Sequence, residues 1–131
     1  VCSSDLLDLN RVAQELNITE DEVSQKITKG LAKITKKVLE ESSSIIGGLY
    51  TSGGDVTIAV CNELEAVGIE VKDEVLPLAV YGRILEGKYH NTAIITKGGL
   101  IGDEKAMIKC TDYLLTKLSN EYHIKNNIDR R

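Results

Sequence analysis

The chain has 131 residues, the size of a single domain with a core of its own. Its formal net charge of −4 at pH 7 argues against a nucleic-acid binder, which needs a basic face. No stretch reaches the roughly 20 apolar residues of a membrane span, so we expect no membrane partner.

The three cysteines, Cys2, Cys61 and Cys110, lie far apart and form no C-x-x-C pair. Such spacing indicates reduced thiols in a cytoplasmic protein, not a disulfide framework or a zinc site. The first residues, Val1–Ser4, look like the end of a strand already under way. We therefore expect the chain to be a piece of a longer protein.

Two helices are predicted in the first third of the chain. Residues 6–16 have mixed apolar spacing and suit a short helix. Thr19 and Glu22 then have the spacing of a capping box, which predicts a helix from there to about Glu41. Apolar residues recur at helical spacing in this second helix, and we expect them to face inward: Val23, Ile27, Leu31, Ile34 and Val38.

Strands and helices alternate along the rest of the chain. We expect strands at Leu49–Ser52, Ile69–Val75, Leu78–Leu85 and Ala93–Ile95. A helix should run from Asp55 to a left-handed glycine cap at Gly68, and another from Asp103 to Leu118, before a frayed tail after Asn120. The inward residues of the last helix are expected to be Met107, Ile108, Leu114, Leu115 and Leu118.

This alternation predicts an α/β fold: a single domain with a mostly parallel sheet flanked by helices in three layers. The uninterrupted apolar run Ala93–Ile95 is typical of a parallel strand covered on both faces. In such sheets ligands bind beyond the carboxyl ends of the strands.

Two glycine-rich turns lie at strand-to-helix junctions, and these are the most informative segments of the chain. They are Tyr50–Asp55, which holds Gly53 and Gly54, and Thr96–Gly102. A glycine lets a ligand approach the backbone closely, and a helix N-terminus favours negative charge. Two such turns suggest a nucleotide, although Gly54-Asp55 stands where a Walker A loop needs Lys followed by Ser or Thr.

Each turn has a binding and a structural interpretation. Asp55 is either the N-cap of its helix or a ligand group that reaches a magnesium-bound water. Lys97 offers a point charge for phosphate oxygens, or else extends into solvent. The glycines of the second turn form either an anion nest or a tight connection that needs positive φ; they are Gly98, Gly99 and Gly102. No catalytic constellation accompanies these residues, which fits half of an active site.

Three segments resemble the C-terminal nucleotide-binding domain of the four-carbon acid sugar kinase family: Thr51–Asp55, Leu76–Arg83 and Thr96–Gly102. The resemblance implies an ATP-dependent kinase of threonate, erythronate or a related tetronate, with Mg²⁺ on the phosphates. It also implies that residues 1–131 are one half of a two-domain enzyme, and that the sugar-acid-binding domain with the catalytic residue precedes them. The implied ATP contacts are Gly53, Gly54, Asp55, Lys97, Gly98, Gly99 and Gly102.

An alternative hypothesis from another class stays open. The chain would then be a non-catalytic regulatory or assembly module whose glycine turns bind an anion or nucleotide, or nothing. In either case an isolated domain should expose an apolar patch, so a homo-oligomer is also expected.

Overall fold

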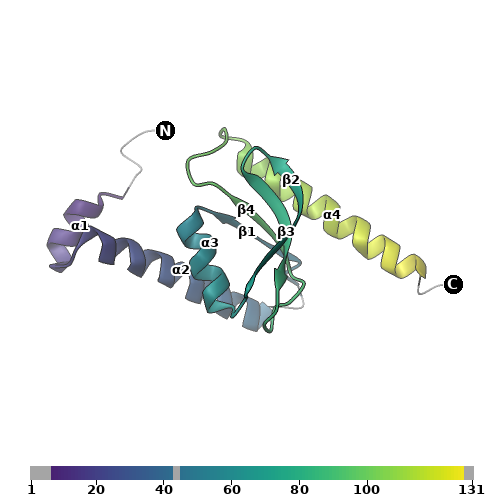
Figure 1. Ribbon diagram of the computed structural model, residues 1–131, viewed down its shortest axis with the longest axis horizontal. Coiled ribbons are helices and arrows are strands. Elements are labelled where there is room, and N and C mark those ends of the chain that lie inside the picture. Colours follow the sequence, from purple (N-terminus) through teal and green to yellow (C-terminus); the bar gives the residue numbers. More distant parts are fainter. Residues whose placement is uncertain (1–6, 43–44, 129–131) are drawn as a thin grey trace.

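The computed structural model describes residues 7–42 and 45–128, so the strand expected at Val1–Ser4 lies outside the described residues. These residues form an α/β domain with one four-stranded sheet and helices on both of its faces (Figure 1). No described helix is both long and apolar enough to cross a bilayer. The elements are α1 (Leu9–Leu16), α2 (Glu20–Ser42), β1 (Gly48–Ser52), α3 (Gly54–Glu63), β2 (Gly68–Leu76), β3 (Ala79–Leu85), β4 (Ala93–Lys97) and α4 (Ala106–Ile128).

The sheet is mixed and mostly antiparallel, so the expectation of a mostly parallel sheet is wrong. Its strand order is β1-β4-β3-β2, and of the three neighbouring pairs only β1 and β4 pair in parallel. The cause is the turn at Pro77-Leu78, where Leu78 has a φ of 59° and sends β3 straight back along β2. Short connections of this kind can join only antiparallel neighbours.

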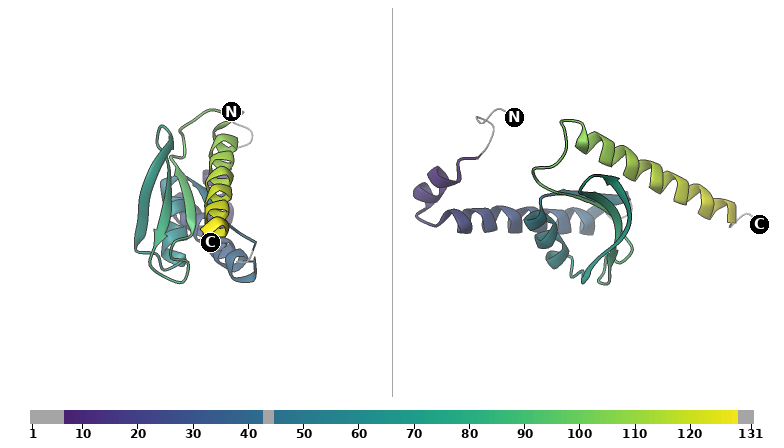
Figure 2. Two further views of the ribbon diagram at one scale, coloured as in Figure 1. Left: turned by 90° about the vertical axis from the view of Figure 1, so that its right-hand side faces the viewer. Right: turned by 45° about the horizontal axis from the view of Figure 1, so that its top comes forward.

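The core lies in two clusters, one on each face of the sheet, which confirms the layered arrangement. Neighbouring residues of a strand point to opposite faces. Ile94 accordingly packs with Val60 of α3 and with Leu64, the residue that follows this helix, and Ile95 packs with Cys110 and Leu114 of α4. Helix α2 covers α3 on the outside of the first cluster. The N-terminal part of α2 and the C-terminal end of α4 extend beyond the sheet at opposite ends of the molecule (Figure 2).

Helix α2 begins as predicted but buries a different face. The Glu22 amide donates to the Thr19 hydroxyl at 3.2 Å, and the Thr19 amide donates to the Glu22 carboxylate at 2.8 Å, so the capping box is confirmed. The buried residues are Val23, Ala32 and Leu39, whereas Ile27, Leu31, Ile34 and Val38 are exposed. Small Ala32 lets α2 approach α3 closely, and this contact decides which face points inward.

The predicted ends of α3 and α4 are also corrected. Gly68 is the first residue of β2 and caps no helix, because α3 ends at Glu63 and the left-handed residue is Glu65. Helix α4 continues to Ile128, so no fraying begins at Asn120. Its inward face is formed by Ala106, Cys110 and Leu114, with Leu118 half-buried, while Met107, Ile108 and Leu115 are exposed.

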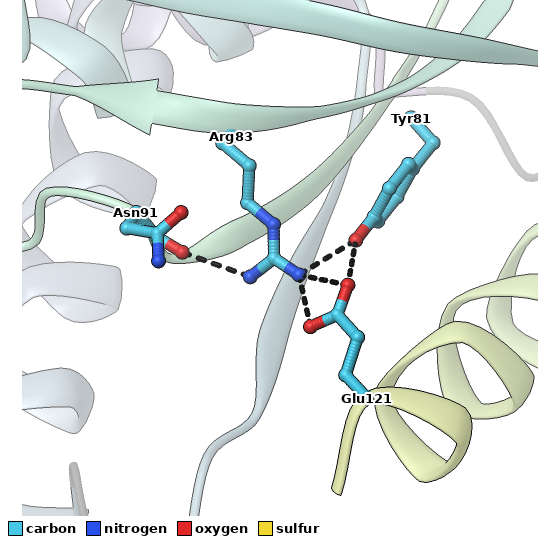
Figure 3. A network of polar contacts seen from close by, with 4 residues as sticks. All are labelled: Tyr81, Arg83, Asn91 and Glu121. Carbon is cyan, nitrogen blue, oxygen red and sulfur yellow. Dashed lines mark hydrogen bonds and ion pairs between the residues drawn. The ribbon is translucent and has the colours of Figure 1, made fainter. Parts of the chain in front are cut away.

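A polar network explains why α4 continues past Asn120 (Figure 3). Arg83 on β3 pairs with both carboxylate oxygens of Glu121 on α4, and it donates to the Asn91 carbonyl at 2.9 Å. The Tyr81 hydroxyl donates to Glu121 at 3.2 Å. This guanidinium holds the pKa of Glu121 below its usual range. The second half of α4 is therefore tied to the sheet by a charged pair.

We predict that Gly82→Ala destabilises the domain. A Cβ at Gly82 would lie 2.6 Å from the Glu70 carbonyl oxygen and 2.7 Å from Ile69 Cγ2 on the neighbouring strand. Overpacking of this kind typically costs about 1–3 kcal/mol. The measurement is the free energy of unfolding in denaturant. Gly30→Ala is the control, because a Cβ there meets nothing within 4 Å in the middle of α2. That control should gain about 0.5–1 kcal/mol; equal stability of Gly82→Ala and the native chain would contradict the prediction.

Candidate functional site

The parallel pairing of β1 with β4 brings the two glycine turns side by side. The paired register ends at Ser52 opposite Lys97. Beyond it, the Gly53 amide donates to the Lys97 carbonyl at 2.9 Å. A Cβ at Gly99 would lie 3.5 Å from the Cα of Gly53. The turns that the sequence singled out therefore share one edge of the sheet.

The first turn leads directly into helix α3. Gly53 is the N-cap with a φ of 97°, and its carbonyl accepts from the Thr57 amide at 3.0 Å. No side chain caps this helix, and helix geometry leaves the amides of residues 54–56 without an acceptor in their own helix. These donors and the helix dipole make the α3 N-terminus suitable for an anion.

Asp55 is not the N-cap, so that interpretation of its role is wrong. The cap is Gly53, because the tight junction after β1 needs a residue with positive φ at that position. Asp55 lies in the first turn of α3 with an exposed side chain. Its carboxylate is thus free to meet a ligand beside the glycine turns.

Two threonines hold the first turn in place. Thr51 is buried, and its hydroxyl lies 2.9 Å from the Thr57 hydroxyl, which donates to the Gly53 carbonyl at 2.9 Å. Their hydroxyls thus tie the end of β1 to the start of α3. The sequence carries no pattern that marks this pair, because the two residues meet only after the chain has turned at Gly53.

The second turn is folded around the side chain of Lys97. This residue is 9% exposed. Its ammonium donates to the carbonyls of Gly98, of Gly99 at 3.4 Å and of Ile101 at 2.7 Å. In this structure its charge is satisfied by the loop and does not extend into solvent.

These contacts set the direction of the loop amides. No peptide bond among the described residues is cis. In a trans peptide the N–H points opposite to the C=O, so carbonyls drawn toward the ammonium turn the following amides away from it. The amides concerned are those of Gly99, Leu100 and Gly102. The loop can therefore offer several donors to an anion on its outer side.

Some glycines in the two turns are required by the chain itself. A Cβ at Gly98 would lie 2.9 Å from Ile101 Cγ1, and Gly102 has a φ of 96°. Gly54 differs, since a Cβ there meets nothing within 4 Å. The fold does not need a glycine at this position, so its open space is available for a ligand.

The chain is an α/β domain with two glycine turns at one edge of its sheet, and the comparisons identify its family. The family model described as "Nucleotide-binding C-terminal domain" matches residues 3–107, and the chain belongs to this family.

Two curated relatives are sugar-acid kinases. The chain is 58% identical over 116 residues to a D-erythronate kinase of Heliobacterium modesticaldum, covering 88% of this chain and 26% of the relative. It is 24% identical over 106 residues to a D-threonate kinase of Salmonella typhimurium, covering 81% of this chain and 25% of the relative. The chain thus spans about a quarter of the length of these kinases.

Solved structures share the fold. A domain of unknown function from Bordetella bronchiseptica, crystallised with citrate as a domain-swapped dimer, superposes with a TM-score of 0.63 at 24% identity. The match covers 66% of this chain and 22% of that one. A second crystal form of the same protein has a TM-score of 0.60 at 26% identity, over 74% of this chain and 23% of that one.

We predict that Lys97→Met loosens the second turn even without any ligand. The substitution removes the donor that three loop carbonyls share, and each lost bond to a buried polar group costs about 1–3 kcal/mol. Amide hydrogen exchange of residues 98–102 should accelerate at least about tenfold in the nucleotide-free chain. Lys109→Met is the control, because Lys109 pairs with Asp103 beside the same loop but is half exposed. Unchanged exchange in Lys97→Met would show that the ammonium does not hold the loop.

Proposed function

We propose that this chain is the ATP-binding domain of a kinase that phosphorylates a four-carbon sugar acid of the erythronate, threonate or 3-oxo-tetronate type. The family and the two kinase relatives support the activity. The observation that carries the proposal is structural: both glycine turns meet at the N-terminus of α3, with the Gly53 amide bonded to the Lys97 carbonyl.

Backbone amides from both turns and the charge of Lys97 suit a triphosphate. The free amides of Gly54, Asp55 and Val56 face one side of the site. The outward amides of Gly99 and Gly102 face it from the second turn, where Gly98 lets the loop close around Lys97. Lys97 then adds positive charge from beneath the loop. Such preorganised donors stabilise the charge of a transferring phosphoryl group.

Mg²⁺ would neutralise phosphate charge in this site. Among residues 7–42 and 45–128, no group of three or more His, Cys, Asp or Glu side chains forms a metal cluster. Asp55, in the first turn of α3, is an exposed carboxylate at the first glycine turn. A magnesium ion held mainly by phosphates and water needs only one such protein carboxylate.

The rest of the enzyme belongs to the proposal. The sugar acid and the catalytic residue would lie on a preceding domain absent from residues 1–131, since the curated kinases are about four times longer than the aligned part. We place the protein in the cytoplasm, where its free thiols Cys61 and Cys110 stay reduced. Self-association of the kind in the Bordetella domain-swapped dimer is supported by the exposed apolar residues of α2.

Gly54→Ala tests the phosphate site without disturbing the fold. Because a Cβ at Gly54 meets no atom within 4 Å, the variant should fold with unchanged or higher stability. Its methyl group would occupy the space that a phosphate needs, so we expect ATP to bind at least about tenfold more weakly, a loss of about 1.4 kcal/mol. Calorimetric or NMR titration with Mg·ATP measures this. Gly30→Ala in α2 is the matched control and should bind like the native chain.

Two outcomes would overturn the proposal. If the folded native chain shows no binding at millimolar Mg·ATP, the alternative of a regulatory or assembly module is favoured. If residues 1–131 alone phosphorylate a tetronate rapidly, the split active site is wrong. Native affinity in Gly54→Ala would remove the α3 N-terminus from the site.

A further inference from the structure

A groove of about 550 Å³ lies between α2 and α3, next to the glycine turns. Its volume falls in the range of about 300–1,000 Å³ that small-molecule sites occupy. Asp55 belongs to both features, because it stands in the first turn of α3 and also lines the groove. A ligand whose charged end lies at the turns can therefore continue into the groove.

The groove has an apolar floor with amide groups at its sides. Ala32 of α2 and Ala59 of α3 are small, and Ile58 lines the groove while 60% exposed. Flat aromatic rings bind well against such surfaces. Gln25 and Asn62 each carry a carboxamide, one on each helix. A carboxamide has a donor beside an acceptor, which matches the N6 and N7 edge of adenine.

The charges of the groove distinguish between possible occupants. The groove is lined by three carboxylates and two ammonium groups, which leaves one net negative charge. The carboxylates belong to Asp21, Asp55 and Glu63, and the ammonium groups to Lys29 and Lys33. This balance disfavours a polyanion or a sugar acid and is compatible with a neutral nucleoside. The phosphates are better placed outside it, at the amides of Gly54 and Gly99.

We propose that the groove between α2 and α3 binds the adenosine half of ATP, while the two glycine turns bind its phosphates. The inference rests on the proposed function, because it assumes that the turns hold a triphosphate. It assigns the base to Gln25, Asn62 and the Ala32–Ala59 floor, and the ribose to the end of the groove at Asp55.

The test separates the two halves of the ligand. Mg·ATP and Mg·tripolyphosphate are titrated into the native chain and into two variants that fill the groove, Thr28→Phe and Asn62→Phe. Thr28 and Asn62 line the groove from opposite helices. Lys26→Phe is the matched control, because Lys26 lies exposed on α2 and does not line the groove. Folding of each variant is checked by circular dichroism and thermal unfolding.

We expect both groove variants to bind ATP at least about tenfold more weakly. Tripolyphosphate affinity should stay within about twofold of the native value, because the turns are untouched. The control should bind both ligands normally. If Thr28→Phe fails to fold, Asn62→Phe decides alone, since residue 62 is exposed and accepts a larger side chain.

The other possible results would contradict either the groove assignment or the proposed function. Native ATP affinity in a folded groove variant, or an equal loss of tripolyphosphate, overturns the groove assignment. A native chain that binds ATP no more tightly than tripolyphosphate overturns it too and leaves the phosphate site standing. A native chain that binds neither overturns the proposed function together with this inference. Competition between erythronate and ATP that is lost in the groove variants would assign the groove to the sugar acid instead.

Discussion

The parallel pairing of β1 with β4 is the constraint on which the site depends. Strands β1, β4 and β2 all end at this edge, but only β1 and β4 are neighbours and lead into helices, so only here do two strand-to-helix turns meet. The Gly53 amide, bonded to the Lys97 carbonyl, extends the pairing by one step past the last strand residue. The antiparallel strands β3 and β2 then widen the sheet and give α3 and α4 a surface to pack on. The turn that joins them also contacts the site, because the Gly98 amide donates to the Leu78 carbonyl at 3.0 Å.

Lys97 shows how a charged residue can act through the backbone. A lysine near phosphate usually acts as a point charge at the ligand. Here the ammonium is buried, and burial of a charge is costly unless polar groups replace its water. The loop carbonyls do this, and in doing so they turn the loop's amides outward. One side chain thus folds the turn and leaves positive charge close behind it. Without the lysine, the loop would keep the backbone bonds from Gly98 to Leu78 and from Ile101 to Gly98 but would lose the group that gathers its carbonyls.

Local features of the fold could be predicted from the sequence, and so could the position of both glycine turns at one edge of the sheet. The capping box at Thr19 and the helices that follow β1 and β4 depend on residues close in sequence, so their patterns are readable. Strand direction was not readable, because an apolar run such as Ala93–Ile95 looks the same in a covered mixed sheet as in a parallel one. The inward face of α2 was not readable either, since two faces carry apolar residues and only contact with α3 selects Ala32 and Leu39.

The glycines show most clearly what a structure adds to a sequence. The motifs do not distinguish one glycine from another, yet each position has its own requirement for backbone conformation and for space at Cβ. Gly53 and Gly102 have positive φ, and Gly98 leaves no room for a Cβ beside Ile101, so the chain itself demands them. Gly54 sits in the first turn of a helix with open space around it, where alanine would favour folding. The fold therefore gives no reason for a glycine at this position. The proposed phosphate site gives one, because at an uncapped helix N-terminus a glycine lets an anion approach the backbone closely.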